Sequence, residues 1–344
     1  MAKQINGTKT TGLAFYYDEE IFNDIYTSEP DPTSLALIES GAMVEDAEIA
    51  RLISNGSNYF ALPYYKDIEG DEQNYDGQTD LTVDDTESGI MNGVVWGRMK
   101  GWRAVDFVSD FTTADPIRNI LNRIQKWKSK KQQQRLIGIL DAVLSIASDD
   151  DLALHTTDIA ASTAEVTDEN KIALTTARDC VVKANGDKAD DYALAIMHSQ
   201  VANRLSQFNV LEYFKYNLPN GQEADVRVGK TGNMIVLVCD EVPHSVDATS
   251  HAMEYTTYFL GRGVIGHATA PVEHPTEMAR DPEKLGGIEK LYTRYRETMH
   301  PYGFSFEISS LPISPTDAQL HDKANWKRKY DAKNIYISRF ISNG

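Results

Sequence analysis

The segment 224–231, ADVRVGKT, has the spacing of a phosphate-binding loop, with alanine in place of the first glycine. The apolar run 234–239 that comes after it ends at Asp240 and Glu241, like the metal-binding strand that accompanies such loops. Together these residues could support nucleotide hydrolysis. That chemistry requires the loop to open a helix, because the backbone amides and the dipole of the helix hold the phosphates.

The surrounding sequence argues against this chemistry. Gly232 and Asn233 lead directly into the apolar run, and the nine residues between Lys230 and Asp240 are too few for a crossover helix, which takes about a dozen. Residues 216–222, before the loop, indicate a turn. We therefore interpret GKTGN as a turn between two strands, and a P-loop NTPase is a remote alternative.

A second motif, Gly261-Arg-Gly263-Val-Ile-Gly266, matches the dinucleotide-binding fingerprint. It comes after an expected strand, but the next residues, HATAPVEHP, contain two prolines and no helical period. No helix is therefore expected to receive a pyrophosphate. A turn or β-bulge is the better interpretation of these glycines.

Histidine and cysteine spacings predict no reactive site. The eight histidines show no HxxxH pattern, and His244 and His251 are seven apart in a segment without helical signals. Cys180 and Cys239 each lie alone in an apolar stretch, so we expect both to be small buried hydrophobes. Because a GxSxG motif is also absent, we predict no catalytic residues, no metal site and no cofactor.

The net charge of −17 is unevenly distributed along the chain. Residues 1–90 hold 19 Asp or Glu against 4 Lys or Arg, whereas the other 254 residues hold 32 against 30. Segment 98–135 reverses the sign, with ten basic residues and three aspartates. Such a chain is a poor candidate for nonspecific DNA binding. The acidic part serves either solubility or contact with the basic part of a neighbouring subunit.

The expected elements are those of an α+β protein. Residues 1–33 have no helical or strand period and suggest an extended arm, and 34–56 indicates a helical stretch with one break. Strands expected at 58–65 and 93–107 enclose a loop with nine acidic residues, so 58–105 is predicted as one long hairpin with a charged tip. A hairpin of this kind is marginally stable alone and needs a surface to lie on.

Asp115-Pro116 is a helix start, and the helix is expected to reach residue 147, about 48 Å in length. Its middle, 128–135, is polar all round, which predicts that it spans solvent or supports a partner. Further on, a helix is expected from a Thr167 cap to Gly186, and a short helix from Ser199. Other strands are expected at 191–198, 234–239, 255–260, 291–298, 302–308 and 335–341.

Five stretches carry a family resemblance. They are SGAMVEDAEIARLISNGSNYFALPYYKDIEGD (40–71), the basic strand with DPIRNILNRI (115–124), YFLGRGVIGHA (258–268), PTEMARDP (275–282) with the later MHPYGFSF (299–306), and SPTDAQLHDKANWKRKYDAKNIYI (314–337). In this order they resemble the major capsid proteins of tailed bacteriophages with the HK97-type fold, in a siphovirus-like branch. Residues 1–33 and 150–190 match only weakly.

The resemblance implies an α+β HK97-like capsid fold. Residues 1–57 would form the N-terminal arm and 58–105 the E-loop hairpin with its base strands. Residues 106–151 and 271–344 would form the P-domain, with a spine helix at 115–147, and 152–270 the A-domain. The function implied is that of a head shell protein, assembling as hexamers and pentamers into an icosahedral shell around double-stranded DNA.

In that setting we predict an electrostatic contact between subunits. The acidic hairpin tip of one subunit would lie near the basic strand and spine helix of the next. The acidic side chains are Asp67, Glu69, Asp71, Glu72, Asp76 and Asp80, and the basic ones are Arg98, Lys100, Arg103, Arg123, Lys126, Lys128, Lys130 and Lys131.

The resemblance also implies partners. About 57 residues precede the hairpin and show no sustained heptads, so a separate scaffolding protein is expected, together with a portal protein. The family leaves room for a decoration protein, and DNA would be packaged without sequence-specific binding. No membrane contact is expected, and the protein would be assembled in the bacterial host cytoplasm and reside in the virion. The nearest alternative, an encapsulin-type nanocompartment shell protein, fits the E-loop and C-terminal matches less well.

Overall fold

The computed structural model describes residues 40–344 except 55, 67, 69, 76–77, 79, 81–82, 84, 107–115, 147–148, 162, 164, 174, 209–211, 218–222, 232–233, 248–250 and 311. It describes only the backbone of 116–122, 125, 212–217 and 223–231. The expected arm, residues 1–33, and the helix cap at Asp115 lie outside the described residues.

The chain divides into two compact units. The described part of the smaller unit comprises Met99–Trp127 and His274–Arg294. The larger unit comprises Asp31–Arg98, Lys128–Glu273 and Tyr295–Gly344. Three elements pass from one unit into the other: β4 (Trp96–Val105), α5 (Pro116–Leu144) and β14 (Ile288–Pro301).

The smaller unit is built on the hairpin of β13 (Thr276–Asp281) and the first half of β14, which pair in antiparallel register. β4 lies against β14, where the Thr293 hydroxyl donates to the Lys100 carbonyl at 3.4 Å. Trp102 on β4 meets Trp127 on α5 edge to face, with ring centroids 5.5 Å apart. These contacts give the unit its own small packed interior.

The larger unit contains an eight-stranded mixed sheet. Its order is β5 (Thr156–Asp158), β17 (Ile337–Ser342), β11 (Met253–Gly261), β6 (Tyr192–Met197), β9 (Met234–Val238), β8 (Glu223–Thr231) and β7 (Glu212–Asn217), with β10 (His244–Val246) paired to β11. All six residues of β6 are buried, because both faces of the sheet are covered.

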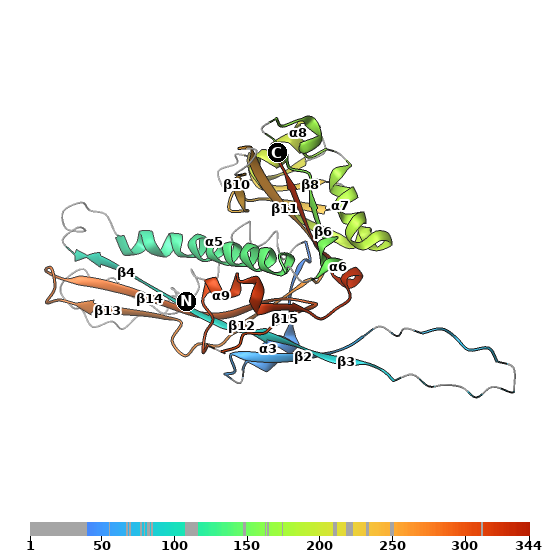
Figure 1. Cartoon of the computed structure of the whole chain (residues 1–344). Coiled ribbons are helices and arrows are strands. Elements are labelled where there is room, and N and C mark those ends of the chain that lie inside the picture. The colour runs from blue at the N-terminus through green and yellow to red at the C-terminus, as the bar shows by residue number, and fades with distance from the viewer. Residues whose placement is uncertain are drawn as a thin grey trace. The chain divides into compact units, whose positions relative to one another are not determined.

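Alternate residues of this sheet enter two different cores. Leu194 and Ile196 pack with the C-terminal half of α5 in one core. Ala195 and Met197 pack on the other face with α7 (Thr176–Asn185) and α8 (Ser199–Gln207), which Figure 1 shows outside the sheet. The helix expected from Thr167 is in fact a 3-10 turn at Asp168–Asn170 followed by α7, since Ala173 and Thr176 close a hydrogen-bonded turn between them.

The long helix α5 is 29 residues long and agrees with the expected spine helix, ending three residues earlier than predicted. Leu136, Ile139 and Leu140 are buried in the main core. The prediction that the polar middle, 128–135, spans solvent was wrong for two of its residues, while the alternative that it supports a partner stays a prediction. Gln133 and Arg135 are buried, 7% and 3% exposed, and the buried Glu297 pairs with Arg135 there.

Residues 41–54 were predicted as part of a helical stretch, and the structure corrects this. Gly41 has a φ of +71° and turns the chain into β1 (Met43–Glu45), which pairs in parallel with β12 (Ile265–Ala270). The helix α3 (Ala47–Ser54) begins only after Asp46. Asp46 accepts from the amides of Glu48 and Ile49, so it ends the strand and caps the helix.

The predicted hairpin also needs a correction. β2 (Tyr59–Tyr65) and β3 (Ser88–Val94) form a two-stranded sheet by themselves. The chain leaves it at Val95, and β4 belongs to the sheet of β14. The hairpin therefore spans 59–94 rather than 58–105, because the next strand, β4, pairs with β14 instead of β2.

The rest of the larger unit consists of short elements beside β12 and the second half of β14. β15 (Phe304–Phe306) pairs with β16 (Trp326–Arg328), and α9 (Asp317–Leu320) and α6 (Asp150–Ala153) are single turns. β17, expected in the P-domain, lies in the eight-stranded sheet between β5 and β11. Sequence-distant segments thus share one sheet.

Candidate assembly surfaces

The structure excludes the phosphate-loop interpretation of residues 224–231. This segment is strand β8, and Thr231 pairs with Met234 in an antiparallel hairpin with β9. A strand, not a helix, therefore comes after Lys230, and no helix N-terminus is available there for a phosphate. The turn predicted at GKTGN is wrong for Gly229–Thr231, which lie in β8, and its last two residues lie outside the described residues.

The glycine fingerprint at 261–266 is confirmed as a turn. Gly261 ends β11, Gly263 has a φ of +64°, and β12 begins at Ile265. The pairing of β11 with β6 shifts register between Leu260 and Gly261. The three glycines thus serve a tight connection between two strands, as a left-handed backbone requires at Gly263.

Metal chemistry has no support in the described residues, where no group of three His, Cys, Asp or Glu side chains is placed to hold an ion. His198 and His244 lie 5.1 Å apart between ring centroids, with Asp240 3.8 Å from His198 Nε2. Both cysteines are free and buried, as predicted, and burial raises the pKa of each thiol.

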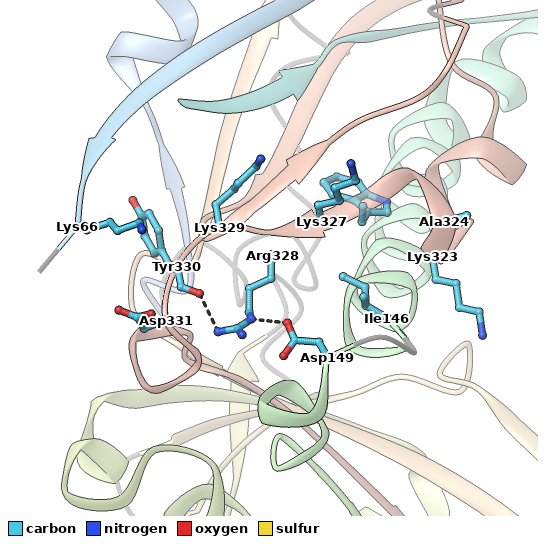
Figure 2. Close-up of a pocket in the computed structure, with 11 residues that line it drawn as sticks. Lys66, Ile146, Asp149, Lys323, Ala324, Lys327, Arg328, Lys329, Tyr330 and Asp331 are labelled. Atoms are coloured by element: carbon cyan, nitrogen blue, oxygen red, sulfur yellow. Dashed lines mark hydrogen bonds and ion pairs between the residues drawn. The ribbon is translucent and has the colours of Figure 1, made fainter. Parts of the chain in front are cut away.

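A hollow of about 690 Å³ lies in the larger unit (Figure 2). Four of its five basic side chains pair with carboxylates of the same chain. Arg328 pairs with Asp149 and donates to the Tyr330 carbonyl at 3.1 Å. The Nζ atoms of Lys327 and Lys329 form ion pairs with the Glu307 carboxylate at 2.7 and 2.8 Å.

These ion pairs provide partners for the charged side chains that line the hollow. The hydrogen bonds from the two lysines lower the pKa of Glu307, so this carboxylate stays ionised and paired. A nucleophile with an adjacent base is absent from the described lining residues. The described lining of the hollow is therefore crossed mainly by ion pairs within the subunit.

The β2–β3 hairpin has two apolar faces, and only one is covered by its own subunit. Phe60 and Leu62 are 5% exposed and Met91 1%, packing with Ile49, Ile53, Ala268 and Ala270. The Phe60 ring lies directly over Gly93, where an added Cβ would come within 2.1 Å of it. The inner face thus anchors the hairpin root.

The outer face carries Pro63 and Tyr65 on β2, opposite Ile90 and Ser88 on β3. Tyr65 is 76% exposed and Ile90 58% exposed. Beyond the strands the same arm exposes more large apolar side chains. They are Ile68, Tyr75 and Val83. So many exposed apolar groups on one two-stranded arm mark a contact surface.

The acidic side chains predicted for the contact lie on this arm. Asp71, Glu72 and Asp80 are exposed and form no ion pair with any residue that the structure describes. Asp67, Glu69 and Asp76 lie outside the described residues. The described part of the hairpin tip is therefore acidic, and its carboxylates are available to contact another subunit.

The basic side chains predicted for the contact fall into two groups. Those of the larger unit are occupied within the subunit: Arg98 pairs with Asp317 at 2.6 Å, Lys130 with Glu241 at 2.5 Å, Lys131 bonds Gln134 at 2.9 Å, and Lys128 lies 5.1 Å from the Tyr295 ring centre. Those of the smaller unit are exposed, without an ion pair to any described residue. They are Lys100, Arg103, Arg123 and Lys126.

Sequence reasoning missed the outer apolar face and the buried Arg135–Glu297 pair. A signal for the first was present, because both alternating sets of FALPYY (60–65) are largely apolar. No local sequence pattern predicts the Arg135–Glu297 pair, because its two residues are 162 positions apart.

Solved structures define the class of protein that has this fold. The chain superposes on the capsid of Ralstonia phage GP4 with a TM-score of 0.58 at 12% identity, covering 89% of this chain and 88% of that one. It superposes on the capsid of cyanophage Pam1 with a TM-score of 0.50 at 10% identity, covering 86% and 88%. The fold is the HK97-like fold of tailed-phage capsids, as predicted.

One curated relative gives a more specific likeness. The chain is 27% identical to the major capsid protein of Bacillus phage SPP1 over 325 residues, 93% of this chain and 94% of that protein. A scan against protein-family models finds no match. The predicted resemblance to tailed-phage major capsid proteins is thus confirmed over nearly the whole length.

Proposed function

We propose that this chain is the major capsid protein of a tailed phage. The likeness to one such protein over 93% of the chain carries the proposal, together with a fold shared with phage capsids. The chain would assemble as hexamers and pentamers into an icosahedral shell that encloses double-stranded DNA. The alternative of an encapsulin-type compartment is not favoured, since the relatives found are phage capsid proteins.

Its role would be structural rather than catalytic. A separate scaffolding protein and a portal protein would be partners, with room for a decoration protein. The protein would reside in the virion after assembly in the host cytoplasm. Among the described residues, no helix combines the length and the apolar character that crossing a bilayer takes.

The proposed domain division is that of the family, with two changes from the prediction. Residues 1–57 would be the arm, 59–94 the E-loop, and α5 the spine of the P-domain. The A-domain would be the eight-stranded sheet with α7 and α8. β17 would count with it, although 271–344 was predicted as P-domain, because its neighbours are β5 and β11.

Assembly would be driven by the outer face of the hairpin. Tyr65 and Ile90 are largely exposed in the isolated subunit. Burying such a side chain fully against a second copy stabilises the contact by about 1.5–3 kcal/mol. The hairpin root is already anchored, so less ordering entropy opposes the association than for a loose arm.

Charge would set the register of this contact. Asp71, Glu72 and Asp80 on one copy would face the unpaired cations of the smaller unit on another. These cations are Lys100, Arg103, Arg123 and Lys126. Exposed pairs contribute only about 0–1 kcal/mol each, so they favour one register and curvature more than they hold the shell.

The triple reversal D71K/E72K/D80K tests this contact. We expect correctly folded subunits that give few or aberrant shells in negative-stain images, because each new lysine would meet a cation. The matched control E165K/E169K/D187K makes the same charge change at exposed sites of the larger unit and should assemble normally. Reversing Lys100, Arg103 and Lys126 to Glu in the triple variant should restore shells. Normal shells from the triple variant would refute the electrostatic contact and leave the capsid function standing.

A further inference from the structure

A buried histidine lies beneath the β2–β3 hairpin, against Phe60, and one of its ring nitrogens has no hydrogen-bond partner among the described residues. His300 on β14 is 1% exposed, and its Nε2 is enclosed with no partner among the described residues. Its ring meets Phe60 of β2 edge to face at 5.6 Å and Tyr302 at 5.9 Å. A neutral imidazole is compatible with the apolar surroundings of Nε2, whereas a protonated imidazolium would need water or a hydrogen-bond acceptor there.

The groups that could compensate a charge on His300 are few. From the start of α3, Asp46 faces it, and from its own strand end, Tyr302. β2 presents only the Phe60 ring, and β12 presents Gly266 in register with His300. Asp46 already accepts from the Tyr302 hydroxyl and from two backbone amides, so it is poorly placed to take another donor.

We propose that His300 is an acid-sensitive latch of the β2–β3 hairpin: its protonation displaces Phe60 and releases the hairpin root from the body of the subunit. Hydrating Nε2 requires one wall to move. The Phe60 wall is the weakest, since β2 belongs to a two-stranded sheet that the subunit holds by its inner face and a few side-chain hydrogen bonds, whereas β12 and β14 belong to a larger sheet.

Burial of His300 sets the direction of the pH dependence. Burial lowers the pKa of His300 to about 4, although the Asp46 carboxylate acts in the opposite direction. When the root opens, the pKa returns toward about 6.5. The closed root is therefore fully stable above pH 6.5 and loses stability as the pH falls from 6.5 toward 4. The inference is independent of the proposed function, but it would let acid loosen the arm that is proposed to join subunits.

Hydrogen–deuterium exchange on the full chain at pH 7.5 and 5.5 tests the latch, with intrinsic exchange rates corrected for pH. Both values lie above the isoelectric point of about 4.9, which limits precipitation. The two pKa values predict about tenfold more opening of peptides 59–65 and 88–94 at pH 5.5. The sheet peptide 192–197 should not change. H300Q, which cannot titrate, should remove the pH dependence at the root.

Two further variants keep the test decisive. H155Q removes another buried histidine whose pKa burial lowers, so it should leave the pH response of the hairpin intact. D46N retains a helix-capping side chain but removes the charge that favours protonated His300 in the closed root, so the pKa of His300 there falls further and the roughly tenfold acid-induced opening at pH 5.5 should persist. Loss of the pH response in D46N, or equal pH dependence in wild type and a folded H300Q, would overturn the proposal.

Discussion

Replacing Arg135 with methionine is expected to lower the free energy of unfolding by about 3–5 kcal/mol. Arg135 lies in the middle of α5 and is 3% exposed, and its Nη1 donates to Glu297 Oε1 at 2.8 Å. Glu297 is 1% exposed. The substitution keeps the length of the side chain but leaves this carboxylate with only Gln132 and Trp96 as donors, so a buried charge loses its counter-ion.

Arg135 also pairs with Asp317, which ties the first residue of α9 to α5. Burial acts to raise the pKa of Asp317, but hydrogen bonds from Arg135 and Arg98 lower it to about 2. The loss should therefore affect two contacts at once. Urea unfolding of unassembled subunits, followed by circular dichroism, measures it.

Two controls separate the buried pair from helix effects. K130M removes an exposed cation of the same helix that pairs with Glu241, and it should cost less than about 1 kcal/mol. R135M/E297L removes both charges and should recover most of the stability, since no charge is then stranded. If R135M were no less stable than K130M, the buried pair would not be a principal support of this unit.

The second large effect is expected from Phe60→Ala. Truncating a buried phenylalanine costs about 3–5 kcal/mol, and here the loss falls on the apolar surface that anchors the hairpin. We expect exchange protection in 59–65 and 88–94 to be lost while that of 192–197 persists. Shell assembly should fail with it, because the outer face is then no longer held in place.

Tyr65→Ala is the matched control on the other face of the same strand. Tyr65 is 76% exposed, so its removal should change subunit stability by no more than about 0.5 kcal/mol. Assembly should nevertheless weaken, because the side chain is proposed to be buried between copies. Retained hairpin protection in Phe60→Ala, or full assembly of Tyr65→Ala, would contradict the roles assigned to the two faces.

The sequence was sufficient where local patterns decide the structure. Both glycine motifs were rejected because of the residues immediately after them, an apolar strand in one case and a proline-containing segment in the other, and the structure has β9 and β12 there. The Asp115-Pro116 start predicted α5, because a cap and a proline fix the first turn of a helix. Strand β2 was predicted from its apolar content and turn-rich flanks.

Local patterns failed where distant segments decide the outcome. Val44 fits a helical period, yet it lies in β1 because the Gly41 turn brings this segment beside β12. Arg135 sits among polar residues, yet Glu297, 162 residues further on, draws it into the core. The contact cations were chosen by charge alone, and sequence could not show that Arg98 and Lys130 already pair within the subunit.

The particle mass of the purified chain, by mass photometry with negative-stain microscopy, tests the capsid proposal most directly. The measurement is made with and without a scaffolding protein. For a chain of 38.4 kDa we expect rings of five or six copies, about 190 or 230 kDa, or closed shells. A stable monomer or dimer that hydrolyses ATP, with nucleotide binding abolished by Lys230→Ala, would contradict the capsid function.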